Sequence, residues 1–200
     1  MPELSEKKII GLTGSMGSGK STVASIIRER FPVLDCDEVN RDLLKKGNAG
    51  YEALLANGLN FLNEEGNLDK QKMASAIFSD EKLRKKSESI LHPLIFKEME
   101  KWISRQGSPL VFVEMPLLFE ISAEKYFDVI WCVISNRDIA LERLQNGRNI
   151  SVEEALARWK AQLDPDYKKA HSHYVIINNG SLAELREQIL DNIERSLNGD

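Results

Sequence analysis

The 200-residue sequence has little cysteine and no long apolar segment. Its two cysteines, Cys36 and Cys132, fall in or at the end of predicted strands, where small buried side chains are more common than disulfides or metal ligands. No run approaches the roughly 20 apolar residues that a membrane-spanning helix needs. The N-terminal residues have no apolar segment behind a basic start. We therefore expect a cytoplasmic protein with no membrane contact and no metal at its cysteines.

The sequence also lacks an excess of positive charge, because 27 Lys and Arg stand against 31 Asp and Glu, for a net charge of −4. General binders of nucleic acid or of anionic membranes are usually basic, so we predict neither partner. A small polyanion remains compatible, because it needs only a local cluster of Lys and Arg. No internal repeat, low-complexity segment or sign of an obligate protein partner is present. This length predicts one α/β domain with smaller excursions.

The segment from Thr13 to Thr22, TGSMGSGKST, matches the phosphate-binding pattern G-x-x-x-x-G-K-[ST]. Residues 8–12 before it are typical of a buried parallel strand, and the spacing of apolar residues after it predicts a helix over 21–30. Such a loop points backbone N–H groups at phosphate oxygens, while Lys20 supplies charge and Ser21 can hold magnesium. The alternative is a Gly/Ser-rich turn that matches by chance. The lysine, the hydroxyl and both flanking elements argue against it.

Two further predicted strands end in carboxylates. Residues 33–34 lead into Asp35-Cys36-Asp37, and an extended backbone there would point both carboxylates to one side. Asp37 precedes a helix predicted over 38–47, so it is either a helix N-cap or the carboxylate that holds an acceptor hydroxyl or magnesium, and one residue can do both. Glu114 closes the apolar strand 109–114. It is equally a magnesium partner or an edge carboxylate without a ligand.

The other segments complete the predicted order of elements. Residues 49–106 show helical spacing with a cap at Ser79-Asp80 and a kink or restart at Pro93, and we interpret them as an insertion over the rim of the sheet. Strands are predicted at 127–134 and 174–177. Between them lies a helical pair with arginines at its tip, which is either a mobile lid or an ordinary solvated pair, then a polar connection over 164–169. The last segment, 182–197, predicts a surface helix, and the order as a whole predicts a doubly wound parallel sheet of about five strands with helices on both faces.

Taken together, the motifs resemble those of the dephospho-coenzyme A kinases, a family of P-loop kinases, over nearly the whole chain. The matching residues are Gly11–Thr22, Asp35-Cys36-Asp37 with Arg41, Leu91-His92-Pro93-Leu94-Ile95, Pro116–Glu120, Glu142-Arg143-Leu144 with Arg148, Gln162, and Asn178 before Gly180-Ser181. The resemblance implies transfer of the ATP γ-phosphate to the ribose 3′-hydroxyl of dephospho-coenzyme A, with Mg²⁺, as the final step of coenzyme A synthesis. It also implies three parts, which are a nucleotide-binding core (1–37, 107–136 and 165–200), a helical acceptor domain (38–106) and a lid (137–164).

The resemblance also implies roles for single residues. Asp37 orients or deprotonates the acceptor hydroxyl, and Lys20 and Arg148 are the other catalytic residues. Asn178 lies near the adenine. ATP contacts are implied for Gly14, Met16, Gly17, Ser18, Gly19, Lys20, Ser21, Thr22, Arg143, Arg148 and Asn178. Acceptor contacts are implied for Asp37, Arg41, His92 and Leu117, and magnesium contacts for Ser21 and Glu114.

Three positions depart from the family pattern. Cys36 stands where alanine is usual, Glu114 where aspartate is frequent, and Ile177 where aspartate is common. The first change exchanges one small side chain for another, the second keeps the charge and lengthens its reach, and the third removes a charged side chain. None removes the expected chemistry.

Two other functions are compatible with a phosphate loop. A kinase of another small acceptor, such as a nucleoside or nucleotide, would keep the core and replace the set Asp37, Arg41 and His92. A regulatory GTP-dependent switch would share only the loop. The sequence lacks the Asn-Lys-x-Asp guanine motif and has no Asp-x-x-Gly suitably placed after a strand, which argues against the switch.

Overall fold

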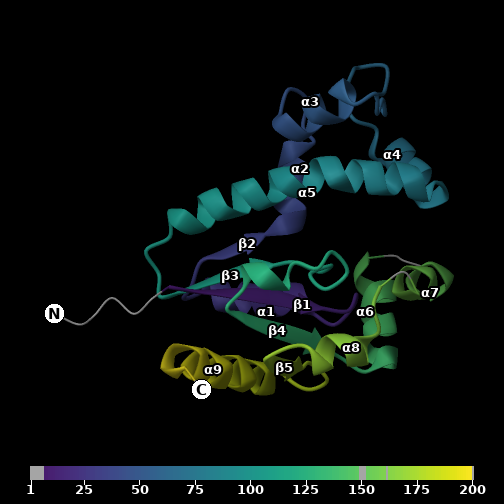
Figure 1. Ribbon diagram of the computed structural model, residues 1–200. Coiled ribbons are helices and arrows are strands. Elements are labelled where there is room, and N and C mark those ends of the chain that lie inside the picture. Colours follow the sequence, from purple (N-terminus) through teal and green to yellow (C-terminus); the bar gives the residue numbers. More distant parts are fainter. Residues whose placement is uncertain (1–6, 149–151, 161, 200) are drawn as a thin grey trace. The chain divides into compact units, whose positions relative to one another are not determined.

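Five strands form one sheet in the order β2-β3-β1-β4-β5 (Figure 1). The strands are β1 (Lys8–Gly14), β2 (Val33–Asp35), β3 (Leu110–Glu114), β4 (Val129–Ile134) and β5 (Tyr174–Ile177). β1 pairs in parallel with β3 on one side and with β4 on the other, and β4 pairs in parallel with β5. The doubly wound sheet predicted from the sequence is therefore confirmed, with the phosphate-loop strand β1 at its centre.

The computed structural model describes residues 7–148, 152–160 and 162–199. Contacts divide the chain into two compact units, Asp35–Arg105 and Met1–Leu34 with Gln106–Asp200. The larger unit carries nearly all of the sheet. The predicted division into a nucleotide-binding core, an acceptor domain and a lid describes ligand binding and motion, which these contacts do not test. It therefore stays a prediction.

One face of the sheet is covered by α1 (Lys20–Arg28) and α9 (Leu182–Asn198). Alternate residues along each strand point to this face, which is why Trp131 and Val133 of β4 share one core with apolar residues of both helices. Phe112 of β3 meets Trp131 edge to face, with ring centroids 5.1 Å apart. Such burial of apolar surface is the main term that holds a domain of this kind together.

The opposite face of β4 contacts the short helix α8 (Pro165–Ala170). The prediction of a polar connection over 164–169 was therefore wrong. Asp164 caps the helix by accepting a hydrogen bond from the backbone N–H of Asp166, and Pro165 occupies the first turn, where its missing N–H costs nothing. Lys168 of this helix is fully buried.

The remaining helices of the larger unit are α6 (Arg137–Arg148) and α7 (Val152–Lys160), which follow β4 and contact each other, and the 3₁₀ turn η1 (Glu124–Tyr126). They are the helical pair expected between the fourth and fifth strands. Ser181 and Glu184 form a capping box at the start of α9. The segment Ser151-Val152-Glu153-Glu154 has the sequence pattern of a second capping box, but Ser151 lies outside the described residues.

The smaller unit consists of α2 (Cys36–Leu43), α3 (Ala49–Ala56), α4 (Lys70–Ser79) and α5 (Glu81–Ser104). As predicted, residues 49–106 contain no strand, only an isolated bridge between Leu62 and Leu68. Asp80 caps α5 through the backbone N–H groups of Lys82 and Leu83. The helix continues through Pro93 without a restart, because it packs along its length against the other three helices.

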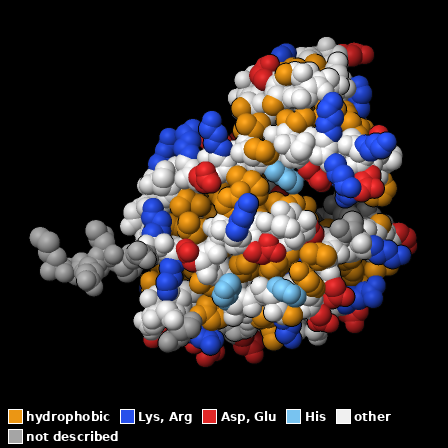
Figure 2. Space-filling view, in the orientation of Figure 1, with side chains coloured by type: hydrophobic (Ala, Val, Ile, Leu, Met, Phe, Trp, Pro, Cys, Tyr) orange, Lys and Arg blue, Asp and Glu red, His pale blue; other side chains and the backbone are white. Residues whose placement is uncertain are grey.

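The surface carries charge of both signs. In Figure 2, acidic and basic side chains are interspersed over the face in view, and neither sign covers it. Among the described residues, no helix is both long and apolar enough to cross a bilayer.

Candidate functional site

The phosphate loop connects the end of β1 to the start of α1 and is enclosed by neighbouring elements. Gly17 and Gly19 have φ values of 80° and 89°, in the left-handed region that favours glycine. A Cβ on Gly17 would lie 2.7 Å from the carbonyl oxygen of Ala140 in α6, and a Cβ on Gly19 would overlap the Asn178 amide. The loop therefore has its shape only because these two positions carry no side chain.

Lys20 is folded into this loop. Its Nζ donates hydrogen bonds of 2.8 Å to the carbonyl oxygens of Gly14 and Ser15, and the side chain is 9% exposed. No side chain caps the start of α1 at Gly19, whereas Ser21 and Thr22 are exposed on its first turn. An ammonium group, uncapped helix N–H groups and accessible hydroxyls together suit a phosphate chain.

The far side of the loop is held at Ser18 by two residues from distant elements. Asn178, which follows β5, donates from Nδ2 to the Ser18 carbonyl oxygen over 2.9 Å. Arg143 of α6 donates to the backbone oxygen of Asn178 at 3.1 Å, to its Oδ1 at 3.3 Å and to the Ser18 oxygen at 3.5 Å. The structure thus brings together three residues for which ATP contacts were expected.

The near side of the loop is held at Met16. Trp159 of α7 donates from its indole N–H to the Met16 carbonyl oxygen over 3.0 Å. The Gln162 Oε1 accepts from the Met16 N–H over 3.3 Å. The sequence pointed to Gln162 only through the family resemblance and gave no role to Trp159, because a contact across 143 residues leaves no local pattern.

Glu114 ends β3 beside the loop. It is 8% exposed and stands in register with Leu12, two residues before Gly14. The described residues contain no group of three or more His, Cys, Asp or Glu side chains that could hold a metal. Within this part of the chain, a metal ion would take most of its ligands from phosphate and water, as Mg²⁺ usually does.

Asp35, and not Asp37, caps α2. Its Oδ1 accepts from the backbone N–H groups of Asp37 at 2.8 Å and Glu38 at 3.1 Å. The expectation of an extended Asp35-Cys36-Asp37 segment was wrong, because the chain enters the helix at Cys36. The predicted helix over 38–47 instead spans Cys36–Leu43. Asp37 consequently lies in the first helical turn, and its carboxylate is not the capping group.

The residues expected to contact the acceptor lie in both units. Arg41 is half-exposed, with its Nη2 3.8 Å from Asp35 Oδ2 and 3.9 Å from Glu38 Oε1. His92 of α5 meets the ring of Phe96 edge to face at 6.4 Å. Leu117 belongs to the larger unit and is 45% exposed after β3. Arg148 ends α6, but its side chain lies outside the described part of the structure, so its role stays a prediction.

Both cysteines are buried, as predicted, and neither forms a disulfide. Burial raises the pKa of the Cys132 thiol, which keeps it protonated and unreactive at neutral pH.

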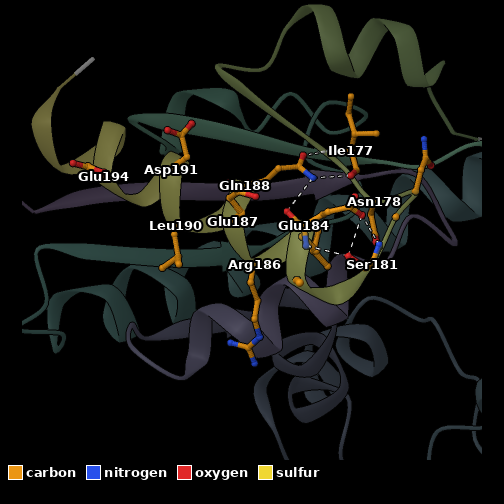
Figure 3. Close-up of a pocket in the computed structure, with 14 residues that line it drawn as sticks. Ile177, Asn178, Ser181, Glu184, Arg186, Glu187, Gln188, Leu190, Asp191 and Glu194 are labelled. Carbon is orange, nitrogen blue, oxygen red and sulfur yellow. Dashed lines mark hydrogen bonds between the residues drawn. The ribbon is translucent and has the colours of Figure 1, made fainter.

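A groove runs along the first turns of α9 (Figure 3). Of the residues expected in the site, it includes only Asn178. Beside it, the Gln188 amide accepts from the Ile177 N–H at 2.9 Å and donates to the Ile177 oxygen at 3.0 Å. The Ile177 backbone is therefore occupied by Gln188, and the half-exposed side chain has no polar atom to offer a ligand.

Comparisons with known proteins agree with this geometry. A family model described as dephospho-CoA kinase matches residues 8–184. A dephospho-CoA kinase of Streptococcus agalactiae is 41% identical over 192 residues, covering 94% of this chain and 98% of its own. A Thermus thermophilus crystal structure has a TM-score of 0.87 and 34% identity over 96% of this chain and 98% of that one. A dephospho-CoA kinase from Campylobacter jejuni, 24% identical, shares the fold with a TM-score of 0.68 over 96% and 98% of the two chains.

Proposed function

Because this chain belongs to the dephospho-CoA kinase family, we propose that its phosphate loop binds ATP and that Asp37 directs the γ-phosphate to the ribose 3′-hydroxyl of dephospho-coenzyme A. The reaction is an ATP-dependent phosphoryl transfer to an alcohol. The observation that best supports the ATP site is the loop itself, in which Lys20 is held by two loop carbonyls beside an uncapped helix start.

ATP binding uses the ammonium of Lys20 and the backbone N–H groups of the loop, both of which can bind an anion. The ammonium of Lys20 exchanges its contacts with Gly14 and Ser15 for the outer phosphate oxygens, which a cation stabilises as charge develops on them. Backbone N–H groups of the loop and of the first turn of α1 hold the remaining phosphate oxygens. Arg143 and Asn178 stabilise the loop conformation, because Asn178 binds the Ser18 carbonyl oxygen and Arg143 binds Asn178. The adenine is expected beside Asn178.

The transfer step makes the bond between O3′ and the γ-phosphorus and breaks the bond between that phosphorus and the β–γ bridging oxygen. The proton of the 3′-hydroxyl passes to the Asp37 carboxylate, and ADP leaves with the bridging oxygen. We assign Arg41, His92 and Leu117 to the binding of the acceptor. Arg148 is assigned to the transferring phosphoryl group, whose charge calls for a cation.

Mg²⁺ is the metal that this chemistry requires, and the donor set fits it. Ser21 offers an exposed hydroxyl and Glu114 a carboxylate at the end of the neighbouring strand, both of them hard oxygen ligands. When bound, the ion would be held by Ser21 and Glu114 and would neutralise charge on the phosphate oxygens during the transfer. Few protein ligands are needed, because ATP supplies the others.

A panel of acceptors tests the proposal. ADP release is measured with ATP and each of dephospho-coenzyme A, a nucleoside and a nucleotide, and the product is analysed for a 3′-phosphate. We expect turnover with dephospho-coenzyme A and a product phosphorylated at O3′. Faster turnover with a nucleoside or nucleotide would identify a kinase of another acceptor, and GTP hydrolysis without transfer would identify a switch.

A further inference from the structure

Met16 of the phosphate loop is held by the side chains of Trp159, near the end of α7, and Gln162, just after it. We propose that Trp159 and Gln162 are positioning residues for phosphoryl transfer, which hold the peptide groups around Met16 in the orientation that transfer requires. We call these two side chains the loop clamp. The inference rests on the proposed kinase function. It adds that these two side chains fix the conformation of the phosphate loop.

The clamp is complementary to the backbone that it holds. An indole N–H can only donate, and it meets the Met16 carbonyl oxygen at 3.0 Å. The amide oxygen of Gln162 can only accept, and it meets the Met16 N–H at 3.3 Å. The two side chains belong to one turn, because the Gln162 N–H donates to the Trp159 carbonyl oxygen over 3.0 Å. One turn of chain therefore satisfies both backbone groups of one loop residue.

Packing adds to these hydrogen bonds. The Met16 side chain is 9% exposed and forms a small cluster with Leu144, Leu141 and Trp159. The Arg137 guanidinium lies over the Trp159 ring, 5.6 Å from its centroid. Residues from both helices of the predicted lid, α6 and α7, thus surround the same loop residue.

Fixing Met16 determines the direction of the next peptide groups. The loop has a second anchor at Ser18, where Asn178 and Arg143 bind the carbonyl oxygen. Between the two anchors stands only Gly17, whose backbone no side chain restrains. With both ends held, the Gly17 N–H has little freedom. Without the clamp, the peptide groups that precede Gly17 can rotate out of this orientation. A small misplacement of reacting groups lowers the rate of transfer strongly.

Loss of the clamp should cost the fold little. A cavity of about 420 Å³ borders Met16, Trp159 and Gln162, so water can enter and satisfy the Met16 N–H in their place. Water restores the hydrogen bond but does not restrain the direction of the peptide. A role in positioning and a role in folding therefore predict different results.

The test compares Gln162→Met, Trp159→Phe and the double variant. Methionine keeps the length of glutamine without its acceptor, and phenylalanine keeps a ring without the N–H. The matched control is Gln145→Met, at an exposed glutamine of α6. For each protein, kcat, the KM values for ATP and acceptor, and the melting temperature with and without ATP are measured.

We expect Gln162→Met to lower kcat about tenfold, well below the 10²-fold that a 1 Å misplacement can cost, with the KM for ATP changed less than about threefold. Trp159→Phe should lower kcat in the same direction. The double variant should fall short of the product of the two losses, because both side chains act on one residue. Gln145→Met should behave as the wild type.

A wild-type kcat in Gln162→Met, or fully multiplicative losses in the double variant, would overturn the inference. So would a lowered melting temperature with unchanged kcat, since that result describes a packing role. Failure of the proposed function is a separate result. If the wild-type protein phosphorylates an acceptor other than dephospho-coenzyme A, the same variants are measured with that acceptor and the clamp is still tested.

Discussion

At the scale of single residues, Asp35 and Asp37 separate two tasks that one aspartate at a helix start could combine. Asp35 accepts hydrogen bonds from the two N–H groups that open α2, and Asp37 lies in the first turn with its carboxylate outside that cap. Substitutions at the two positions should therefore have different effects. Those at Asp35 should act on the stability of α2, and those at Asp37 on chemistry.

Replacing Asp37 by asparagine should abolish most activity without unfolding the protein. Asparagine keeps the shape but cannot take the proton of the 3′-hydroxyl, and a general base contributes about 10² to 10⁴ in rate. We expect turnover to fall at least about a hundredfold, with ATP binding retained and a melting temperature near the wild-type value. Steady-state kinetics and calorimetry measure both quantities.

Asp35→Ala is the matched control, because it removes the cap and costs about 1 kcal/mol of stability. Near-normal turnover in Asp37→Asn would leave Asp37 without a catalytic role and make Asp35 the next candidate for the base. Loss of ATP binding instead would place the Asp37 carboxylate at the metal, which prefers a charged oxygen ligand.

At the scale of elements, α8 is tied to the segment after β3 by a buried ion pair. Lys168 Nζ lies 2.6 Å from Glu120 Oε1 and donates to the Pro116 carbonyl oxygen over 3.1 Å. The same Glu120 oxygen accepts from the Leu163 N–H, and Thr13 of β1 donates to the Pro116 oxygen. These contacts fix the backbone on either side of Leu117.

Lys168→Met should therefore destabilise the protein strongly. Breaking such a pair leaves the Glu120 carboxylate, 14% exposed, without its cation, and losses of about 3–5 kcal/mol are usual. Urea denaturation measures the loss. Lys169→Met, at the exposed neighbour on α8, is the control and should change stability little. Adding Glu120→Gln to Lys168→Met should restore part of the stability, and an equal or greater loss in that double variant would contradict the buried-pair interpretation.

The pair of Glu29 and Arg186 links α1 to α9 on the surface and predicts a pH dependence. Two hydrogen bonds of 2.6 and 2.9 Å from Arg186 lower the pKa of the Glu29 carboxyl. A group whose pKa is lowered by folding stabilises the protein above its ordinary pKa, and the contribution is lost as the pH falls through the lowered value. The difference in stability between wild type and Arg186→Ala should thus shrink on acidification. A difference that is constant from neutral to acidic pH would show that the pair contributes through packing alone.

The sequence predicted some helices and strands more accurately than others. Apolar runs predicted β4 and β5 closely, since such a run has few alternatives in a parallel sheet. The six-residue helix α8 was missed because it is too short to show periodicity, although Asp164 and Pro165 are its start signal. Asp35 was missed as the cap because an aspartate at either position fits the local pattern.

At the scale of the whole molecule, the sequence placed the phosphate loop and named Arg143 and Asn178 beside it. It could not show how they act, because the contacts of Arg143 with Ser18 and of Asn178 with Ser18 join residues 125 and 160 positions apart. Local patterns carry no record of such contacts. The order of the motifs was sufficient to identify the family, whereas the hydrogen-bond partners of Arg143 and Asn178 became visible only in the structure.

Ligand binding should be visible in the stability of the whole protein. ATP with Mg²⁺ binds only the native loop, so the melting temperature should rise with ATP concentration. At an ATP concentration of a hundred times the Kd, the free energy of unfolding should increase by about 2.7 kcal/mol. Lys20→Ala should blunt this rise, because it removes the ammonium that exchanges its contacts with Gly14 and Ser15 for phosphate oxygens. No shift for the wild type at millimolar ATP, or a larger shift with GTP, would contradict the ATP site.

The contact of Gln188 with Ile177 has a consequence for the protein in a crowded solution. β5 ends the sheet on one side, and a bare row of backbone groups there invites a strand of another molecule to add on. Gln188 occupies both the N–H and the carbonyl of Ile177 with its amide, as an added strand would. An incoming chain must first break both of these hydrogen bonds, on a strand of only four residues. This side-chain amide therefore hinders the growth of the sheet into an intermolecular aggregate.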